Sequence, residues 1–140
     1  EAHASVLFPG AREAIERLAA RGPIAIASGA LRAEIERVLE RENLRGHFPV
    51  LVAAGDTPKS KPDPAPYAKA VAGLAAIVPA LAPRQCVAIE DSRWGLESAR
   101  AAGLRTIAIT TSYARDDLRA ADIIVGHLDE ITSELLSTLA

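Results

Sequence analysis

Short apolar runs alternate along the chain with longer segments in which apolar residues recur at helical spacing. The apolar runs are bounded by turn-forming residues and predict strands over 24–27, 50–54, 85–89, 106–110 and 122–125. The helical periodicity predicts helices over 11–21, 31–42, 66–76, 94–102 and 130–139. Strands that alternate with helices are typical of an α/β protein with a doubly wound, mostly parallel sheet. We find no internal repeat or linker and predict one core domain over 1–140.

Two adjacent carboxylates follow the buried strand predicted over 85–89. Glu90 and Asp91, with Ser92 after them, stand where the strand ends. In parallel sheets the carboxyl ends of the strands open into the ligand crevice, and carboxylate oxygens suit a hard cation such as Mg²⁺. The alternative is that Asp91 or Ser92 only caps the helix beginning near Trp94.

Two further polar positions stand before other predicted helices. Ser28 and Gly29 end the strand over 24–27, where a hydroxyl and free N–H groups can seat a phosphate; Ser28 as a simple helix cap is the alternative. Lys61 is followed by Pro62 and Pro64, which disfavour helix until about residue 67, although a solvated loop lysine is the alternative. Together the hydroxyl, the ammonium and the carboxylates suit a phosphate ester and its metal.

The order of these motifs resembles the haloacid dehalogenase-like (HAD) phosphohydrolase superfamily, in the branch of β-phosphoglucomutase and phosphoglycolate phosphatase. IAIAS resembles the second family motif, with Ser28 at its end. KPDP resembles the third motif and selects Lys61 over Lys59, and VAIEDSRWGLESARAAGL resembles the fourth, with Glu90 and Asp91 as the acidic pair. Two flanking segments also resemble the family: FPGAREAIERLAARG resembles its approach helix, and AADIIVGHLDEI resembles its final strand and tail. The resemblance therefore runs from about residue 7 to the C-terminus.

The resemblance implies Mg²⁺-dependent phosphatase chemistry on a small phosphorylated metabolite, through an aspartyl-phosphate. Ser28 and Gly29 would bind the phosphoryl oxygens, and Lys61 would neutralise their charge. Asp91 would bind Mg²⁺ directly, and Glu90 would bind it or orient its waters. Within the family, substrate identity and the choice between phosphatase and phosphomutase depend largely on a cap domain and an acid/base residue that this sequence lacks.

The family's first motif, Asp-x-Asp on the opening strand, is also missing. That motif supplies the covalent nucleophile, and no aspartate precedes Asp56 here. The helical cap that this branch inserts before its second motif is missing too. The sequence opens on Glu1 and contains no methionine, so we expect a trimmed longer chain, a separately supplied N-terminal piece or, less simply, a naturally reduced form. Losing a covalent catalytic unit has cost on the order of 10⁶-fold in a hydrolase, and we expect the isolated chain to be inactive.

The missing opening strand also bears on the fold. In the family it is central and lies between the strands that here end at Ser28 and Asp91. Unpaired buried backbone groups cost about 1–3 kcal/mol each, against a net domain stability of about 5–15 kcal/mol. We therefore expect a complementing segment, a rearranged sheet or self-association.

The composition limits which partners and which cellular environment we expect for the protein. A hydrophobic content of 49% is enough for a core, and a net charge of −2 gives no field for nucleic acid. No apolar run approaches the roughly 20 residues that span a membrane. The single cysteine, Cys86, cannot form an internal disulfide, which is consistent with a reducing cytoplasm. We interpret Cys86 as a residue that packs on a strand. His3, His47 and His127 lack ligand spacing and are interpreted as surface or turn residues.

Two positions and two functional classes stay open. Trp94 is interpreted as covering the start of its helix, with substrate contact as the alternative, and Thr110–Ser112 as a turn, with a place on the site rim as the alternative. The competing function is a non-catalytic phosphate-binding, metal-binding or interaction module derived from the same fold. An unrelated doubly wound domain of the receiver or flavodoxin type is disfavoured by the ordered serine, lysine and acidic motifs.

Overall fold

The structure is a computed structural model that describes residues 9–140. The predictions on Glu1 and His3, and the beginning of the resemblance, lie outside the described residues. Within these residues there are five helices: α1 Ala11–Ala19, α2 Arg32–Arg41, α3 Ala65–Ala75, α4 Arg93–Ala101 and α5 Ser133–Ser137. The strands are β1 Ala25–Ala27, β2 Val50–Val52, β3 Val87–Glu90, β4 Arg105–Ile109 and β5 Ile123–Val125. Short 3-10 turns cover Arg45–His47, Pro83–Gln85, Arg115–Leu118 and Leu128–Glu130.

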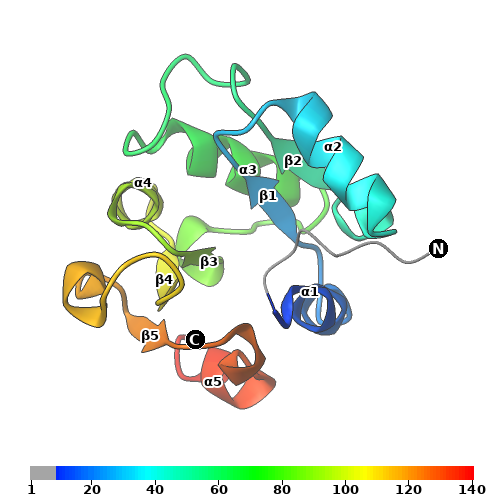
Figure 1. Cartoon of the computed structure of the whole chain (residues 1–140). Coiled ribbons are helices and arrows are strands. Elements are labelled where there is room, and N and C mark those ends of the chain that lie inside the picture. The colour runs from blue at the N-terminus through cyan, green and yellow to red at the C-terminus, as the bar shows by residue number, and fades with distance from the viewer. Residues whose placement is uncertain (1–8) are drawn as a thin grey trace.

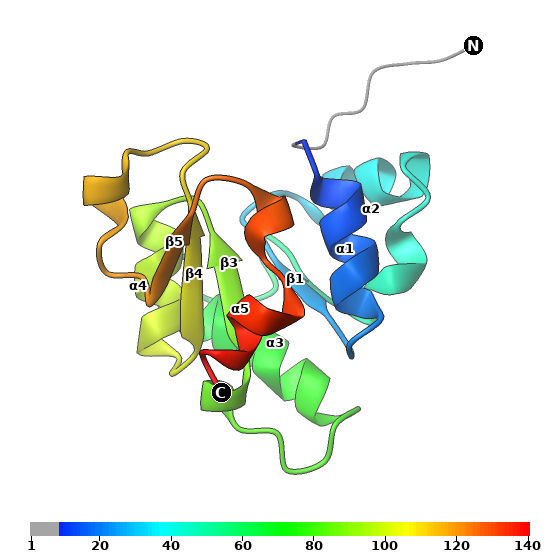
Figure 2. The same cartoon turned by 90° about the horizontal axis from the view of Figure 1, so that it is seen from below.

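All paired strands are parallel, which confirms the predicted α/β class. They form two sheets: β1 pairs with β2, whereas β3, β4 and β5 form a three-stranded sheet in that order. β1 and β3 lie side by side without hydrogen-bonding to each other (Figure 2). The division therefore falls between the two strands that lead to Ser28 and Asp91.

Helices cover both faces of this divided sheet (Figure 1). On one face α3 contacts β1 and β2, and α4 contacts β3 and β4. On the other face, α1 and α2 pack with β1 and β2, and α5 packs on the second sheet. The core is correspondingly divided, with one apolar cluster around Leu39, Leu44 and Phe48 and another around Ile107 and Ile131.

Two helix starts differ from the sequence prediction. α5 begins at Ser133 and not near Glu130, because the Glu130 carboxylate accepts hydrogen bonds from the N–H groups of Gly126 and His127 and closes a separate turn. α3 begins at Ala65, since a proline in the first turn of a helix lacks only an N–H that would have no intrahelical partner. Within residues 9–140, no helix combines the length and the apolar character that a membrane crossing demands.

Candidate functional site

Lys61 connects the ends of the two sheets. Its Nζ donates to the carbonyl oxygen of Ala27, at the end of β1, at 2.9 Å. The same atom lies 2.5 Å from Oε2 of Glu90, at the end of β3. The loop that carries Lys61 is anchored on α4, because the Ser98 hydroxyl donates to the carbonyl of Asp63 at 2.6 Å. One ammonium thus sits at the carboxyl ends of both strands, where the sequence predicts the site.

The Glu90 carboxylate is only 8% exposed and has a second donor. The Tyr67 hydroxyl, from α3, donates to the same Oε2 atom that receives Lys61. The Lys61 ammonium lies 5.0 Å from the centre of the Tyr67 ring, a cation–π distance. Burial, followed by the nearby Glu90 charge, raises the pKa of Tyr67 well above its usual range. The phenol therefore stays protonated and acts as a donor.

Gly95 makes room for the Glu90 side chain. A Cβ at position 95 would lie 1.9 Å from Glu90 Oε1 and 2.1 Å from its Cδ. Any larger residue in this first turn of α4 would displace the carboxylate. Tyr67 and Gly95 were not singled out from the sequence as site residues; the available signal was a glycine inside a helical pattern, five residues after the acid.

Ser28 lies at the end of β1 with its hydroxyl outside any helix cap. Its N–H donates to the carbonyl oxygen of Val52 at 2.9 Å, and its Oγ accepts a hydrogen bond from the N–H of Ala30 at 3.1 Å. The N-cap of α2 is Leu31, so the interpretation of Ser28 as a simple cap is wrong. Within residues 9–140 the Ser28 hydroxyl is seen only as an acceptor, and Gly29 is exposed beside it.

Asp91 and Ser92 have separate roles. Ser92 caps α4 by accepting the N–H of Gly95 at 3.1 Å, which confirms that half of the capping interpretation. Asp91 does not cap the helix; its Oδ2 accepts the Ser112 hydroxyl at 2.9 Å. Ser112 follows β4, so this contact brings the Thr110–Ser112 segment to the rim of the site.

The acidic pair contains carboxylates of the kind that Mg²⁺ binds. Within the described chain, no group of three or more histidine, cysteine, aspartate or glutamate residues could hold a metal ion. Mg²⁺ commonly binds through one or two carboxylates and keeps several waters, so the half-exposed Asp91 suits it. Glu90 is already engaged by Lys61 and Tyr67. Two carboxylates and one ammonium leave a formal negative charge here, and the residues fit a cation that takes further ligands from elsewhere.

Two other candidates from the sequence take no part in the hydrogen bonds described above. Cys86 is half-buried, and burial raises the pKa of its thiol, which disfavours the reactive thiolate. Trp94 is 58% exposed in the first turn of α4.

The parallel strands and their covering helices define an α/β protein, with a hydroxyl, an ammonium and carboxylates at the carboxyl ends of its strands. The sequence matches the family of haloacid dehalogenase-like hydrolases over residues 1–103. It is 38% identical over 138 residues to the protein CbbY of Rhodobacter capsulatus, covering 95% of this chain and 59% of that one. It is 34% identical over 131 residues to hexitol phosphatase B of Escherichia coli K12, covering 91% and 57%. The chain belongs to the haloacid dehalogenase-like hydrolases.

A solved structure agrees with this assignment. CbbY from Rhodobacter sphaeroides in complex with phosphate superimposes with a TM-score of 0.80 at 27% identity, over 92% of this chain and 58% of that one. The chain therefore spans less than three fifths of the length of this structure and of the two relatives named above.

Proposed function

We propose that this chain supplies the phosphate-facing part of a phosphatase that hydrolyses a phosphate monoester of a small metabolite with the help of Mg²⁺. The observation that carries the proposal is the position of Lys61, whose ammonium holds the end of β1 beside Ser28 and the end of β3 beside Asp91. The names of the relatives support the substrate class, since one is a hexitol phosphatase and another was solved with phosphate.

Each residue has a distinct task in this proposal. Ser28 and the N–H of Gly29 donate hydrogen bonds to the phosphoryl oxygens, and Lys61 places a positive charge beside them. Glu90 and Tyr67 hold the Lys61 ammonium in place. Asp91 holds Mg²⁺, which when bound supplies the positive charge that a phosphate dianion needs beside two carboxylates.

The covalent nucleophile comes from outside this chain. Among the described aspartates, Asp91 is assigned to the metal, and Asp63, in the loop of Lys61, accepts the N–H of Ala65 with its Oδ1 at 2.9 Å. Asp56 is held by the backbone N–H of Ala53 and by Arg32 and cannot serve in that role. An aspartate on a further strand would attack the phosphorus and break the ester P–O bond, and the metabolite would leave as an alcohol with a proton from an acid that is also outside this chain. Water would then hydrolyse the aspartyl-phosphate to inorganic phosphate and free aspartate. The chain alone is therefore inactive.

The compartment we propose is a reducing cytoplasm, where the unpaired Cys86 is stable.

Metal binding tests the proposal without requiring turnover. Mn²⁺ titrated into the 140-residue chain as a paramagnetic probe should broaden the amide signals of residues 90–92 and 110–112 first. Asp91→Asn should abolish that broadening, whereas Asp56→Asn, a matched change elsewhere, should leave it intact. Broadening centred on another part of the chain would refute the metal assignment. Mg²⁺-dependent hydrolysis of p-nitrophenyl phosphate by the purified chain alone would refute the external nucleophile.

A further inference from the structure

Large apolar side chains gather at the edge of the sheet that carries the site. Within residues 9–140 four of them are exposed, each by between 40% and 60% of its surface: Leu31, Ile77, Trp94 and Tyr113. Three of the four follow the carboxyl end of a parallel strand, Leu31 after β1, Trp94 after β3 and Tyr113 after β4. Ile77 follows α3 on the way to β3 and lies toward the amino ends of the strands. The exposed apolar surface is therefore concentrated around the site.

Trp94 leans toward the groups of the site. It stands in the first turn of α4, three positions after Asp91. Helical side chains lean toward the N-terminus of their helix, which here lies at the end of β3. Ser98, one turn further along the same helix face, donates its hydroxyl to the carbonyl of Asp63 in the loop that carries Lys61. The indole is thus on the side of α4 that faces this loop.

Tyr113 lies on the β4 side of Asp91. It follows Ser112, whose hydroxyl donates to Asp91 Oδ2 at 2.9 Å and holds the segment after β4 against the end of β3. β4 pairs with β3 on the edge that faces away from β1 and Lys61 (Figure 2). The carboxylate assigned to the metal therefore has an exposed aromatic residue on each side.

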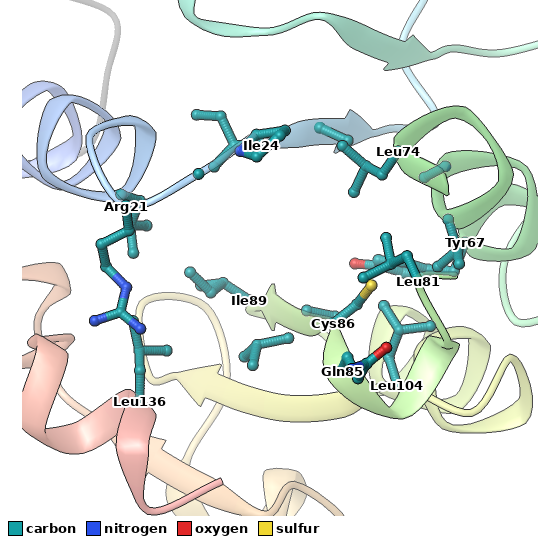
Figure 3. Close-up of a pocket in the computed structure, with 18 of the residues that line it drawn as sticks. Arg21, Ile24, Tyr67, Leu74, Leu81, Gln85, Cys86, Ile89, Leu104 and Leu136 are labelled. Carbon is teal, nitrogen blue, oxygen red and sulfur yellow. The ribbon is translucent and has the colours of Figure 1, made fainter. Parts of the chain in front are cut away.

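Packing does not account for these two exposed rings. The other aromatic side chains of the described chain, Phe48 and Tyr67, are buried. More than half of the Trp94 surface is exposed, so the ring covers little of its own helix. Neither exposed ring lines the large apolar cavity between β1 and β3, which has a volume of about 790 Å³ and walls that include Ile24 and Ile89 (Figure 3). Both rings are available to a ligand bound beside the acidic pair.

We propose that Trp94 and Tyr113 bind the organic part of the phosphate ester and favour esters that carry a flat ring next to the ester oxygen. Given the proposed function, on which this proposal rests, Ser28, Lys61 and the cation take the other phosphoryl oxygens. The ester oxygen then points out of the edge of the sheet, past the two rings. Aromatic rings stack face to face with an offset or meet edge to face, and such contacts add affinity beyond the area they bury. A small alkyl group gains no such contact.

The test compares esters with and without a ring in their binding to the 140-residue chain in the presence of Mg²⁺. The probes are phenyl phosphate, methyl phosphate and inorganic phosphate, and phosphorus NMR titrations give the three dissociation constants. Phenyl phosphate should bind at least about fivefold more tightly than methyl phosphate, from the aromatic contact and the larger apolar area buried. Trp94 is the single tryptophan of the chain, so its fluorescence should also change with phenyl phosphate and not with methyl phosphate at equal saturation.

Variants at exposed positions test the assignment of the rings. Trp94→Ala should reduce the preference for phenyl phosphate to about twofold or less, whereas Trp94→Phe should keep most of it. Tyr113→Ala should reduce the preference in part. Ile77→Ala, which removes a comparably exposed side chain toward the amino ends of the strands, should leave it unchanged. Circular dichroism checks that each variant folds. Equal affinities for the two esters, or a preference that survives Trp94→Ala, would overturn the proposal.

Inorganic phosphate separates this proposal from the proposed function. Lys61→Met should weaken the binding of all three probes, whereas Trp94→Ala should leave the binding of inorganic phosphate unchanged. Failure of inorganic phosphate to bind, or binding that does not depend on Lys61, would overturn the proposed function and this proposal with it. Lys61-dependent phosphate binding without a preference for the ring would overturn this proposal alone. Equal weakening of all three probes by Trp94→Ala would show a structural role for the indole and would also overturn it.

Discussion

Replacement of Gly95 by alanine tests how tightly the Glu90 carboxylate is held. The added Cβ would meet Glu90 Oε1 at 1.9 Å, while real Cβ contacts stay above 3.0 Å. The carboxylate must therefore leave Lys61 and Tyr67, or α4 must shift. Hydrogen bonds to charged groups contribute about 1.5–3 kcal/mol each, and overpacking costs about 1–3 kcal/mol. Some hydration returns to the displaced carboxylate, and we expect Gly95→Ala to lower the free energy of unfolding by about 2 kcal/mol.

The sign of the effect should reverse when the carboxylate is removed. In a Glu90→Ala background the clash disappears, and alanine is a better helix residue than glycine by up to about 1 kcal/mol. Gly95→Ala should then stabilise the chain, which gives a coupling energy of about 3 kcal/mol between the two positions. Glu90→Gln is the matched control, because glutamine keeps the volume of glutamate and the clash remains.

Urea unfolding followed by far-ultraviolet circular dichroism measures all six combinations at positions 90 and 95. A neutral Gly95→Ala in the wild-type chain would refute the reasoning, as would the same loss in the wild-type and Glu90→Ala backgrounds. An effect in the Glu90→Gln background that matches Glu90→Ala would show that charge, and not space, decides the outcome.

Three further predictions concern other contacts. Tyr67→Phe should lower the free energy of unfolding by about 1.5–3 kcal/mol at neutral pH, because the hydrogen bond to Glu90 is lost. The folded-state pKa of Tyr67 is raised, so the wild-type chain should lose stability as the pH rises above 10, and the variant should lose less. Urea unfolding at a series of pH values measures both effects. The backbone N–H of Ala53, followed by Arg32, holds the pKa of Asp56 below 3.8, so the stability that ionised Asp56 contributes is present above that pH and is lost in more acidic solution. Asp56→Asn should therefore reduce the fall in the free energy of unfolding at acidic pH. An unchanged fall would contradict this. Ser92→Ala should lower thermal stability by about 1 kcal/mol through loss of the α4 cap, with Ser92→Asp as the tolerated control.

The sequence predicted those parts of the structure that depend on local signals. Apolar runs located the five strands of residues 9–140, and the polar residues after three of them marked Ser28, Lys61 and Glu90 as candidates. Local patterns decide these positions because a buried strand must be apolar and its end must turn. The contact of Lys61 with Glu90 followed only from the general rule that carboxyl ends of parallel strands converge.

Contacts between distant segments could not be predicted in the same way. Tyr67 and Glu90 are 23 positions apart, and nothing in either neighbourhood signals their hydrogen bond. The requirement for Gly95 depends on where the Glu90 side chain points, which packing determines. The alternative that Ser28 only caps a helix is wrong, because the cap of α2 is Leu31.

The central claim is that Lys61 and Asp91 form half of a phosphatase site whose other half arrives on a strand. The direct test mixes the chain with a peptide that carries Asp-x-Asp after its apolar run, and measures phosphate release from p-nitrophenyl phosphate with Mg²⁺. Release should require both chain and peptide, should vanish when the first aspartate is asparagine, and should fall about 10²-fold or more with Lys61→Met or Asp91→Asn. A mixture that yields no Mg²⁺-dependent release, or release that Lys61→Met leaves unchanged, would contradict the account.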